Sequence, residues 1–169
     1  MRREERALAT PMNDLPEDHL EVLIAGFGSP HGDDQAGWQV IDTLQKRTEL
    51  PARIVAIREA TELIEELDGC RKLIVVDACC AGDQSGTLSR FEWPDPRIEQ
   101  QHCHSTHGMG VCAALRLAER LGRLPPCVEI FGIEVRDCEP GHEMSFEVWE
   151  AVKELEAVIY AELCQTACA

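Results

Sequence analysis

The stretch VLIAGFGSPHGDDQAGWQVIDTL, residues 22–44, decides the fold class of this chain. It begins as a short apolar run that stops at Gly26, as buried parallel strands do. A glycine-containing turn follows, and it carries two adjacent acids, Asp33 and Asp34. Beyond the turn, helical spacing relates Gly37, Val40, Ile41 and Leu44. A strand, a tight loop and a helix in this order predict an α/β unit.

The rest of the chain repeats this alternation. Further strands are predicted at 52–57, 72–78, 86–93 and 127–135. Helices are predicted from Thr61 as N-cap to a stop at Gly69, over 107–122, and from about Ser145 onward, with a polar loop at 95–106. We therefore expect a three-layer α/β/α fold with a five-stranded, mostly parallel twisted sheet. The connection before 86–93 is too short for a helical crossover, so that strand is predicted to be antiparallel.

Composition narrows the possible functions. The chain has 169 residues and a formal net charge of −15, which disfavours binding to nucleic acid or to an anionic membrane. No apolar run reaches the ~20 residues of a membrane helix. Nine cysteines, an odd number, some of them within predicted strands and helices, are typical of reduced thiols in the cytoplasm. We expect a flexible leader at 1–19, a single domain at 20–169, and a monomer.

Three polar residues are predicted to meet at one edge of the sheet. Asp34 follows the first strand, Asp77 ends the third, and His107 begins the helix after the fourth. If the first and third strands are neighbours, as in a 2-1-3 order, the carboxyl ends of these strands bring the residues together. Two carboxylates and an imidazole suit zinc, nickel, iron or manganese with open coordination positions. The loop itself lacks a complete GxGxxG or a GK[ST] motif, and its acids favour cations over phosphate.

Each residue also has a purely structural interpretation. Asp77 is equally well explained as the cap of a neighbouring loop, and Asp33 and Asp34 as charges that complement a helix dipole. His107, considered by itself, is explained as a surface histidine. A zinc site of Cys79, Cys80, Cys103 and His104 is a weaker alternative, because this spacing matches no common zinc motif. These alternatives stay open at this level.

Taken together, four segments of the chain resemble the hydrogenase maturation endopeptidases, which process the large subunit of nickel–iron hydrogenases. The segments are LIAGFGSPHGDDQAGWQVIDTL, KLIVVDA, STHGMGVCAALRLA and IFGIEVRDCEPGHEMSFEVWEAV. They correspond in order to the family's opening strand and acidic loop, third strand, histidine-bearing helix start, and closing strand and helix. Ser29 stands where the family usually has Asn, and Thr106 where it usually has Pro.

The resemblance implies an endopeptidase that removes the C-terminal peptide of the large-subunit precursor after nickel insertion. It implies that Asp34, Asp77 and His107 contact the nickel, which the substrate supplies and which serves as the recognition signal; other divalent metals are possible at the site. Asp33 is either a support for the helix start or a general base. The sequence contains neither HExxH nor GxSxG, so zincin and serine-triad mechanisms are unsupported.

Two other functions remain as alternatives. One is a non-proteolytic nickel-binding or hydrogenase-assembly scaffold on the same fold, which would bind metal or precursor without cleavage. The other is a binding module for a small nucleotide, which nucleotides would stabilise thermally and nickel would not.

Overall fold

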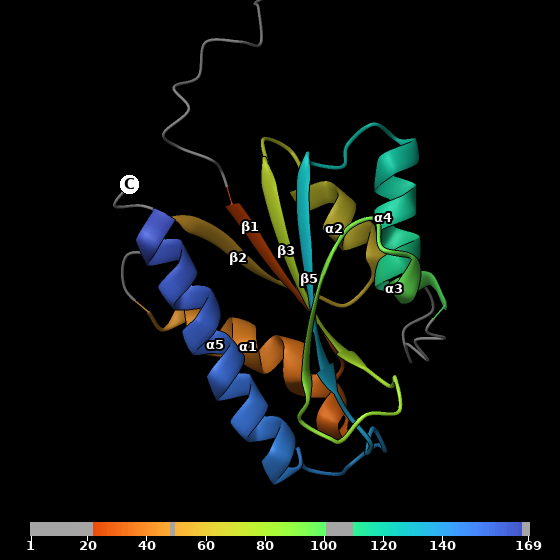
Figure 1. Ribbon diagram of the computed structural model, residues 1–169, viewed down its shortest axis with the longest axis vertical. Coiled ribbons are helices and arrows are strands. Elements are labelled where there is room, and N and C mark those ends of the chain that lie inside the picture. The colour runs from red at the N-terminus through yellow and green to blue at the C-terminus, as the bar shows by residue number, and fades with distance from the viewer. Residues whose placement is uncertain (1–21, 48–49, 101–109, 167–169) are drawn as a thin grey trace, which may run out of the picture.

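The computed structural model describes residues 22–47, 50–100 and 110–166, and the predicted leader at 1–19 lies outside this range. Within it, strands and helices alternate as predicted (Figure 1). The strands are β1 Val22–Phe27, β2 Ala52–Ile57, β3 Lys72–Cys79, β4 Leu88–Glu92 and β5 Cys127–Glu134. The helices are the 3-10 turn η1 Gly32–Gln35, then α1 Ala36–Gln45, α2 Ala60–Glu66, α3 Pro96–Gln100, α4 Val111–Arg120 and α5 Phe146–Thr166.

The five strands form one sheet in the order β2-β1-β3-β5-β4. The strand pairs β1–β2, β1–β3 and β3–β5 are parallel, whereas β4 runs antiparallel to β5 at the edge. The predicted fold class, with one antiparallel strand at 86–93, is confirmed. The 2-1-3 order is also confirmed, so the carboxyl ends of β1 and β3 are neighbours.

Helices cover both faces of the sheet (Figure 1). On one face α1 and α5 pack on a core that includes Ile24, Ile74 and Ile133. On the other face α2 and α4 pack on a core that includes Leu23 and Val75. All six residues of β1 are buried, because this strand lies inside the sheet with a helical layer on each side.

Two local predictions are wrong. Thr61 is not the N-cap of α2, which begins at Ala60, and no side chain caps it; instead Glu62 accepts a hydrogen bond from the N–H of Arg58 at 2.7 Å. The segment predicted as a polar loop contains α3. Asp95 directly precedes this helix and accepts a hydrogen bond from the N–H of Arg97 at 2.8 Å. An Asp followed by Pro is a helix start, and this signal outweighs the polarity of the segment.

Among the described residues, no helix is both long enough and apolar enough to cross a membrane.

Candidate functional site

Two glycines place the acidic loop at the carboxyl edge of the sheet. A Cβ at Gly37, in the first turn of α1, would lie 2.0 Å from the carbonyl oxygen of Phe27 and 2.8 Å from that of Val76. A Cβ at Gly26 would likewise lie 2.4 Å from the carbonyl oxygen of Gly37. Only glycine permits this approach, so α1 starts directly on the ends of β1 and β3. The turn η1, with Asp33 and Asp34, therefore lies beside the end of β3.

Asp34 is held in a buried position at this edge. The residue is 5% exposed, and the Ser29 hydroxyl donates a hydrogen bond to its Oδ2 atom. The backbone closes the same loop, because the Asp34 N–H donates to the carbonyl of His31 at 3.0 Å. Ser29 thus makes a loop hydrogen bond from the position where the resembling family usually has Asn. It fixes one oxygen of the carboxylate that was predicted to contact metal.

Asp77, near the end of β3, has a strongly perturbed carboxyl group. Loss of water around the group, and then the negative charge of Asp34, raise the pKa of Asp77 to about 8, against a smaller opposing hydrogen bond at Ala78. The two carboxylates are therefore close enough to repel each other, as the strand order predicts. A cation between them would relieve that repulsion, and such paired acids are typical of metal or acid–base sites.

Asp33 plays a different part from its neighbour. Its side chain is completely buried. Its Oδ1 atom accepts a hydrogen bond from the N–H of Ser145 at 2.7 Å, and Oδ2 accepts from Arg136 and Asp137 at 3.4 and 3.3 Å. The Asp33 N–H also donates to the carbonyl of Asp137 at 2.7 Å. Asp33 thereby ties η1 to the segment between β5 and α5, a partner that the local sequence does not indicate.

His107, the third predicted metal contact, lies outside the described residues, as do Cys103 and His104 of the alternative zinc site. Within the described ranges, no group of three or more His, Cys, Asp or Glu side chains is arranged to hold a metal ion. The structure therefore brings together Asp34 and Asp77, and it describes no position for the imidazole.

A buried glutamate organises the loop that follows Asp77. Glu134, 4% exposed, accepts hydrogen bonds from the N–H groups of Ala81 at 2.9 Å and Gly82 at 2.8 Å. It caps the chain where β3 leaves the sheet. Sequence reasoning did not single out this residue. Its signal was a charged side chain directly after the apolar run 130–133 of β5.

The cysteines near this edge are free thiols in the described part of the chain. Burial foremost, and then nearby acids that include Asp34, raise the pKa of Cys138 to about 12. Burial, followed by Glu134, also raises the pKa of Cys80. Both thiols are consequently protonated at neutral pH and poorly suited to act as nucleophiles.

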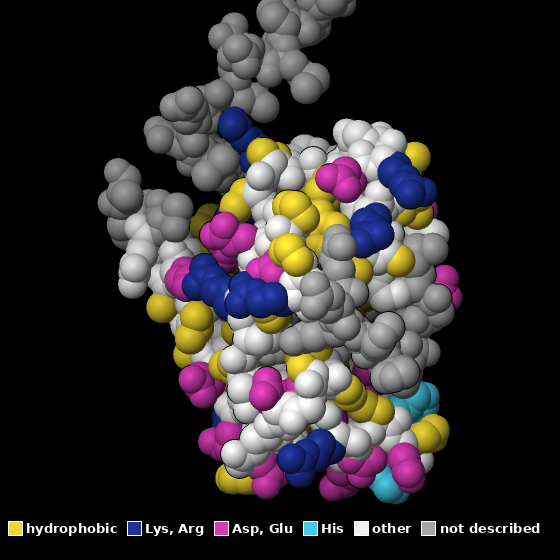
Figure 2. Space-filling view, turned by 45° about the vertical axis from the view of Figure 1, so that its right-hand side comes forward, with side chains coloured by type: hydrophobic (Ala, Val, Ile, Leu, Met, Phe, Trp, Pro, Cys, Tyr) yellow, Lys and Arg dark blue, Asp and Glu magenta, His cyan; other side chains and the backbone are white. Residues whose placement is uncertain are grey.

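Charge is unevenly distributed around the site. In Figure 2, several acidic side chains lie in the lower part of the molecule, together with Lys or Arg, and histidine side chains lie at the lower right. His142, in the segment between β5 and α5, contacts Asp137 at 2.7 Å, and that hydrogen bond raises the pKa of His142. The net charge of −15 makes the chain as a whole attractive to cations.

Asp34 and Asp77 thus lie at the carboxyl edge of the parallel strands, the edge at which α/β sheets form their binding and catalytic sites. The sequence profile described as "Hydrogenase maturation protease" matches residues 38–162. The chain belongs to the hydrogenase maturation protease family, which is a family of peptidases. The matched range contains Asp77 and His107 and begins just after Asp33 and Asp34.

Solved structures agree with this assignment. The [NiFe] hydrogenase maturation protease HybD from Thermococcus kodakarensis is 22% identical with a TM-score of 0.69, covering 85% of this chain and 99% of its own. The hydrogenase-maturating endopeptidase HybD from E. coli is 20% identical with a TM-score of 0.73, covering 86% and 93%. The hydrogenase 2 maturation peptidase from a Thaumarchaeota archaeon is 28% identical with a TM-score of 0.62, covering 85% and 97%. A comparison with curated protein sequences found no significant match.

Proposed function

We propose that this protein removes the C-terminal peptide of a nickel–iron hydrogenase large-subunit precursor after nickel has been inserted, acting in the cytoplasm as a monomer. The observation that carries the proposal is the pair Asp34 and Asp77, brought together at the sheet edge in a chain of this family. Nickel belongs to the substrate and serves as the recognition element. The same site would accept other divalent metals.

In the proposed mechanism Asp34, Asp77 and His107 offer ligands to the nickel of the precursor and so dock it beside the scissile bond. Binding the cation requires Asp77 to lose the proton that its raised pKa retains at neutral pH in the metal-free protein. Water then adds to the peptide carbonyl and the C–N bond breaks, which leaves a carboxylate on the large subunit and an amine on the released peptide. The metal acts as template and Lewis acid.

Asp33 supports this arrangement as a positioning residue. Because both of its oxygens accept backbone N–H groups in a buried site, we assign it the anchoring of η1 rather than proton transfer. In this role Asp33 keeps Asp34 at the sheet edge. The general base is then either Asp77 or another carboxylate in the complex of enzyme and precursor.

The test compares nickel-loaded and nickel-free precursor of the cognate large subunit, with cleavage followed by intact-protein mass spectrometry. We expect cleavage of the nickel-loaded form alone, and loss of at least about a hundredfold in rate for Asp34→Asn and Asp77→Asn. Asp42→Asn is a matched control, because Asp42 is exposed and pairs only with Lys46 on α1 among the described residues. Equal cleavage of both precursor forms would refute nickel recognition. Binding without cleavage would establish the scaffold alternative.

A further inference from the structure

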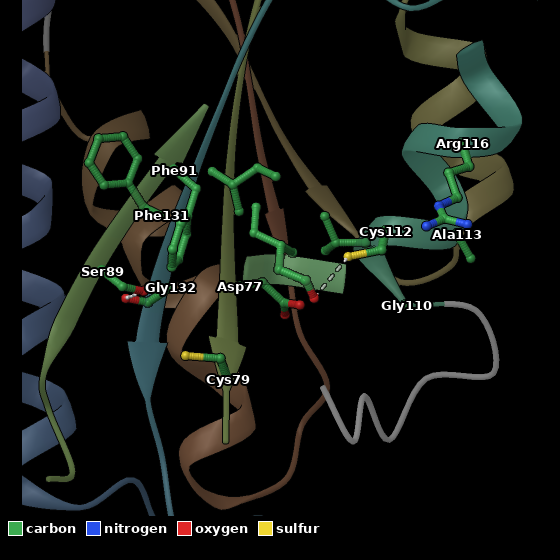
Figure 3. A pocket seen from close by; sticks show the side chains of 13 residues that line it. Asp77, Cys79, Ser89, Phe91, Gly110, Cys112, Ala113, Arg116, Phe131 and Gly132 are labelled. Carbon is green, nitrogen blue, oxygen red and sulfur yellow. Dashed lines mark hydrogen bonds between the residues drawn. The ribbon is translucent and has the colours of Figure 1, made fainter. Parts of the chain in front are cut away.

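A pocket of about 370 Å³ opens directly beside Asp77 (Figure 3). It lies between the end of the sheet and the first turns of α4. Most of its wall is apolar and comes from Phe91, Ile98, Val111, Ile130 and Phe131. Asp77 lies at one side, and Arg116 lines another part of the wall. Its volume falls at the lower end of the ~300–1,000 Å³ that ligand pockets span.

A glycine inside a strand, Gly132, is among the residues that line the pocket. Gly132 of β5 is the register partner of Asp77 on β3 and of Ser89 on β4, so the side chains of these two residues flank it on one face. A Cβ at Gly132 would lie 2.5 Å from the Ser89 hydroxyl oxygen and 3.0 Å from the Cys79 sulfur. Glycine in a strand interior is otherwise unfavourable, and here it lets the Ser89 hydroxyl and the Cys79 sulfur pack against the backbone of β5 at the edge of the pocket.

The position of the pocket relative to Asp77 determines what can occupy it. An extended peptide advances ~3.3–3.6 Å per residue, so a substrate whose scissile bond lies at Asp77 brings the adjoining residues to the pocket mouth. Asp77 and Arg116 are the charged residues of the lining, and the apolar wall between them disfavours a charged side chain, which would lose its water against that wall. An aliphatic or aromatic side chain would instead remove apolar surface from water.

We propose that this pocket binds an apolar side chain of the precursor, within three residues of the cleaved bond, and so sets the sequence specificity of cleavage. The inference rests on the proposed function. In this proposal the enzyme recognises the peptide sequence of the precursor as well as its nickel. The specificity-determining residues are Ser89 and Phe91 from β4, Gly132 from β5, and Ala113 from α4.

The experiment fills the pocket without touching the core. Ala113 lines the pocket and is exposed on α4, so Ala113→Trp places an indole in or across the mouth of the pocket. Ala157→Trp is the matched control, because Ala157 is exposed on α5, which covers the opposite face of the sheet. Ser89→Leu fills the pocket from the strand side and serves as an independent variant. Thermal unfolding confirms that each variant is folded.

Cleavage of the nickel-loaded precursor is then measured for a substrate series with each residue near the cleaved bond replaced singly by Asp. We expect Ala113→Trp and Ser89→Leu to lower kcat/KM at least about tenfold, mainly through KM, and Ala157→Trp to change it less than about twofold. One apolar substrate position should be sensitive to Asp in the wild type and insensitive in Ala113→Trp. Wild-type kinetics in both pocket variants, or no such position, would overturn the inference.

Binding of the precursor to an immobilised protein separates this inference from the proposed function. If the wild type binds but does not cleave, weaker binding by Ala113→Trp still supports the pocket, whereas equal binding refutes it. If the wild type neither binds nor cleaves the nickel-loaded precursor, both the pocket and the proposed function are refuted.

Discussion

Replacing Asp33 by Asn tests whether the buried carboxylate anchors the site. The amide keeps the shape of the side chain but has one acceptor oxygen and one NH₂ group. If the oxygen faces Ser145, the NH₂ group faces the N–H groups of Arg136 and Asp137, which then lack an acceptor. If the amide is turned over, the short bond from Ser145 is lost instead.

The magnitude follows from these contacts. Loss of the charge on the 2.7 Å bond from Ser145 costs about 1 kcal/mol, the difference between charged and neutral hydrogen bonds. The N–H groups of Arg136 and Asp137 now lie 3.4 and 3.3 Å from Oδ2 of Asp33. If an NH₂ group replaces that oxygen, the two buried donors lose their acceptor, which costs a further ~1–3 kcal/mol. We therefore expect Asp33→Asn to lower the free energy of unfolding by about 2–4 kcal/mol, a large share of the stability of a small domain.

Urea unfolding measures this loss. With a urea dependence of ~2 kcal/mol per M, in the middle of the range for small proteins, the midpoint should fall by about 1–2 M. The control Asp42→Asn removes an exposed pair with Lys46 and should cost no more than ~0.5 kcal/mol. If Asp33→Asn is no more destabilising than the control, the anchoring role is wrong. Loss of kcat at unchanged stability would return Asp33 to the role of general base.

Three further predictions concern the same edge of the sheet. Gly37→Ala should lower the free energy of unfolding by about 3 kcal/mol, because the new Cβ would lie 2.0 and 2.8 Å from backbone oxygens. If the variant is instead more stable, as the higher helix propensity of alanine alone would make it, this close packing is wrong. In the metal-free protein, the pKa of Asp77 is about 8 in the folded state, so the folded protein keeps a proton that the unfolded chain releases above about pH 4. The free energy of unfolding should therefore fall as the pH rises from 4 to 8. Asp77→Asn should flatten that part of the profile, and an unchanged profile would refute the assignment. Asp137→Asn should lower the pKa of His142, because Asp137 is the main cause of its raised value, and an NMR titration measures that pKa. An unchanged pKa would show that the pair does not persist in solution.

Strand and helix patterns were local properties, and the sequence therefore predicted them well. The apolar run before Gly26 and the helical spacing from Gly37 to Leu44 led to the correct α/β class, and the short connection after Asp77 predicted the antiparallel strand. Local chemistry was also where prediction failed. Thr61 was predicted as the N-cap of α2, yet that helix begins at Ala60 without a side-chain cap. The Asp–Pro start of α3 was interpreted as part of a polar loop.

The sequence alone thus determined the fold class, the strong negative charge and the candidate acids Asp34 and Asp77. The tertiary structure decided how the neighbouring acids differ: Asp33 meets backbone donors more than a hundred residues away, and Asp34 faces the end of β3. It also decided that a pocket opens beside Asp77, lined by residues of β4, β5 and α4. Periodicity and composition are properties of consecutive residues, whereas partners and cavities arise only when distant segments pack together.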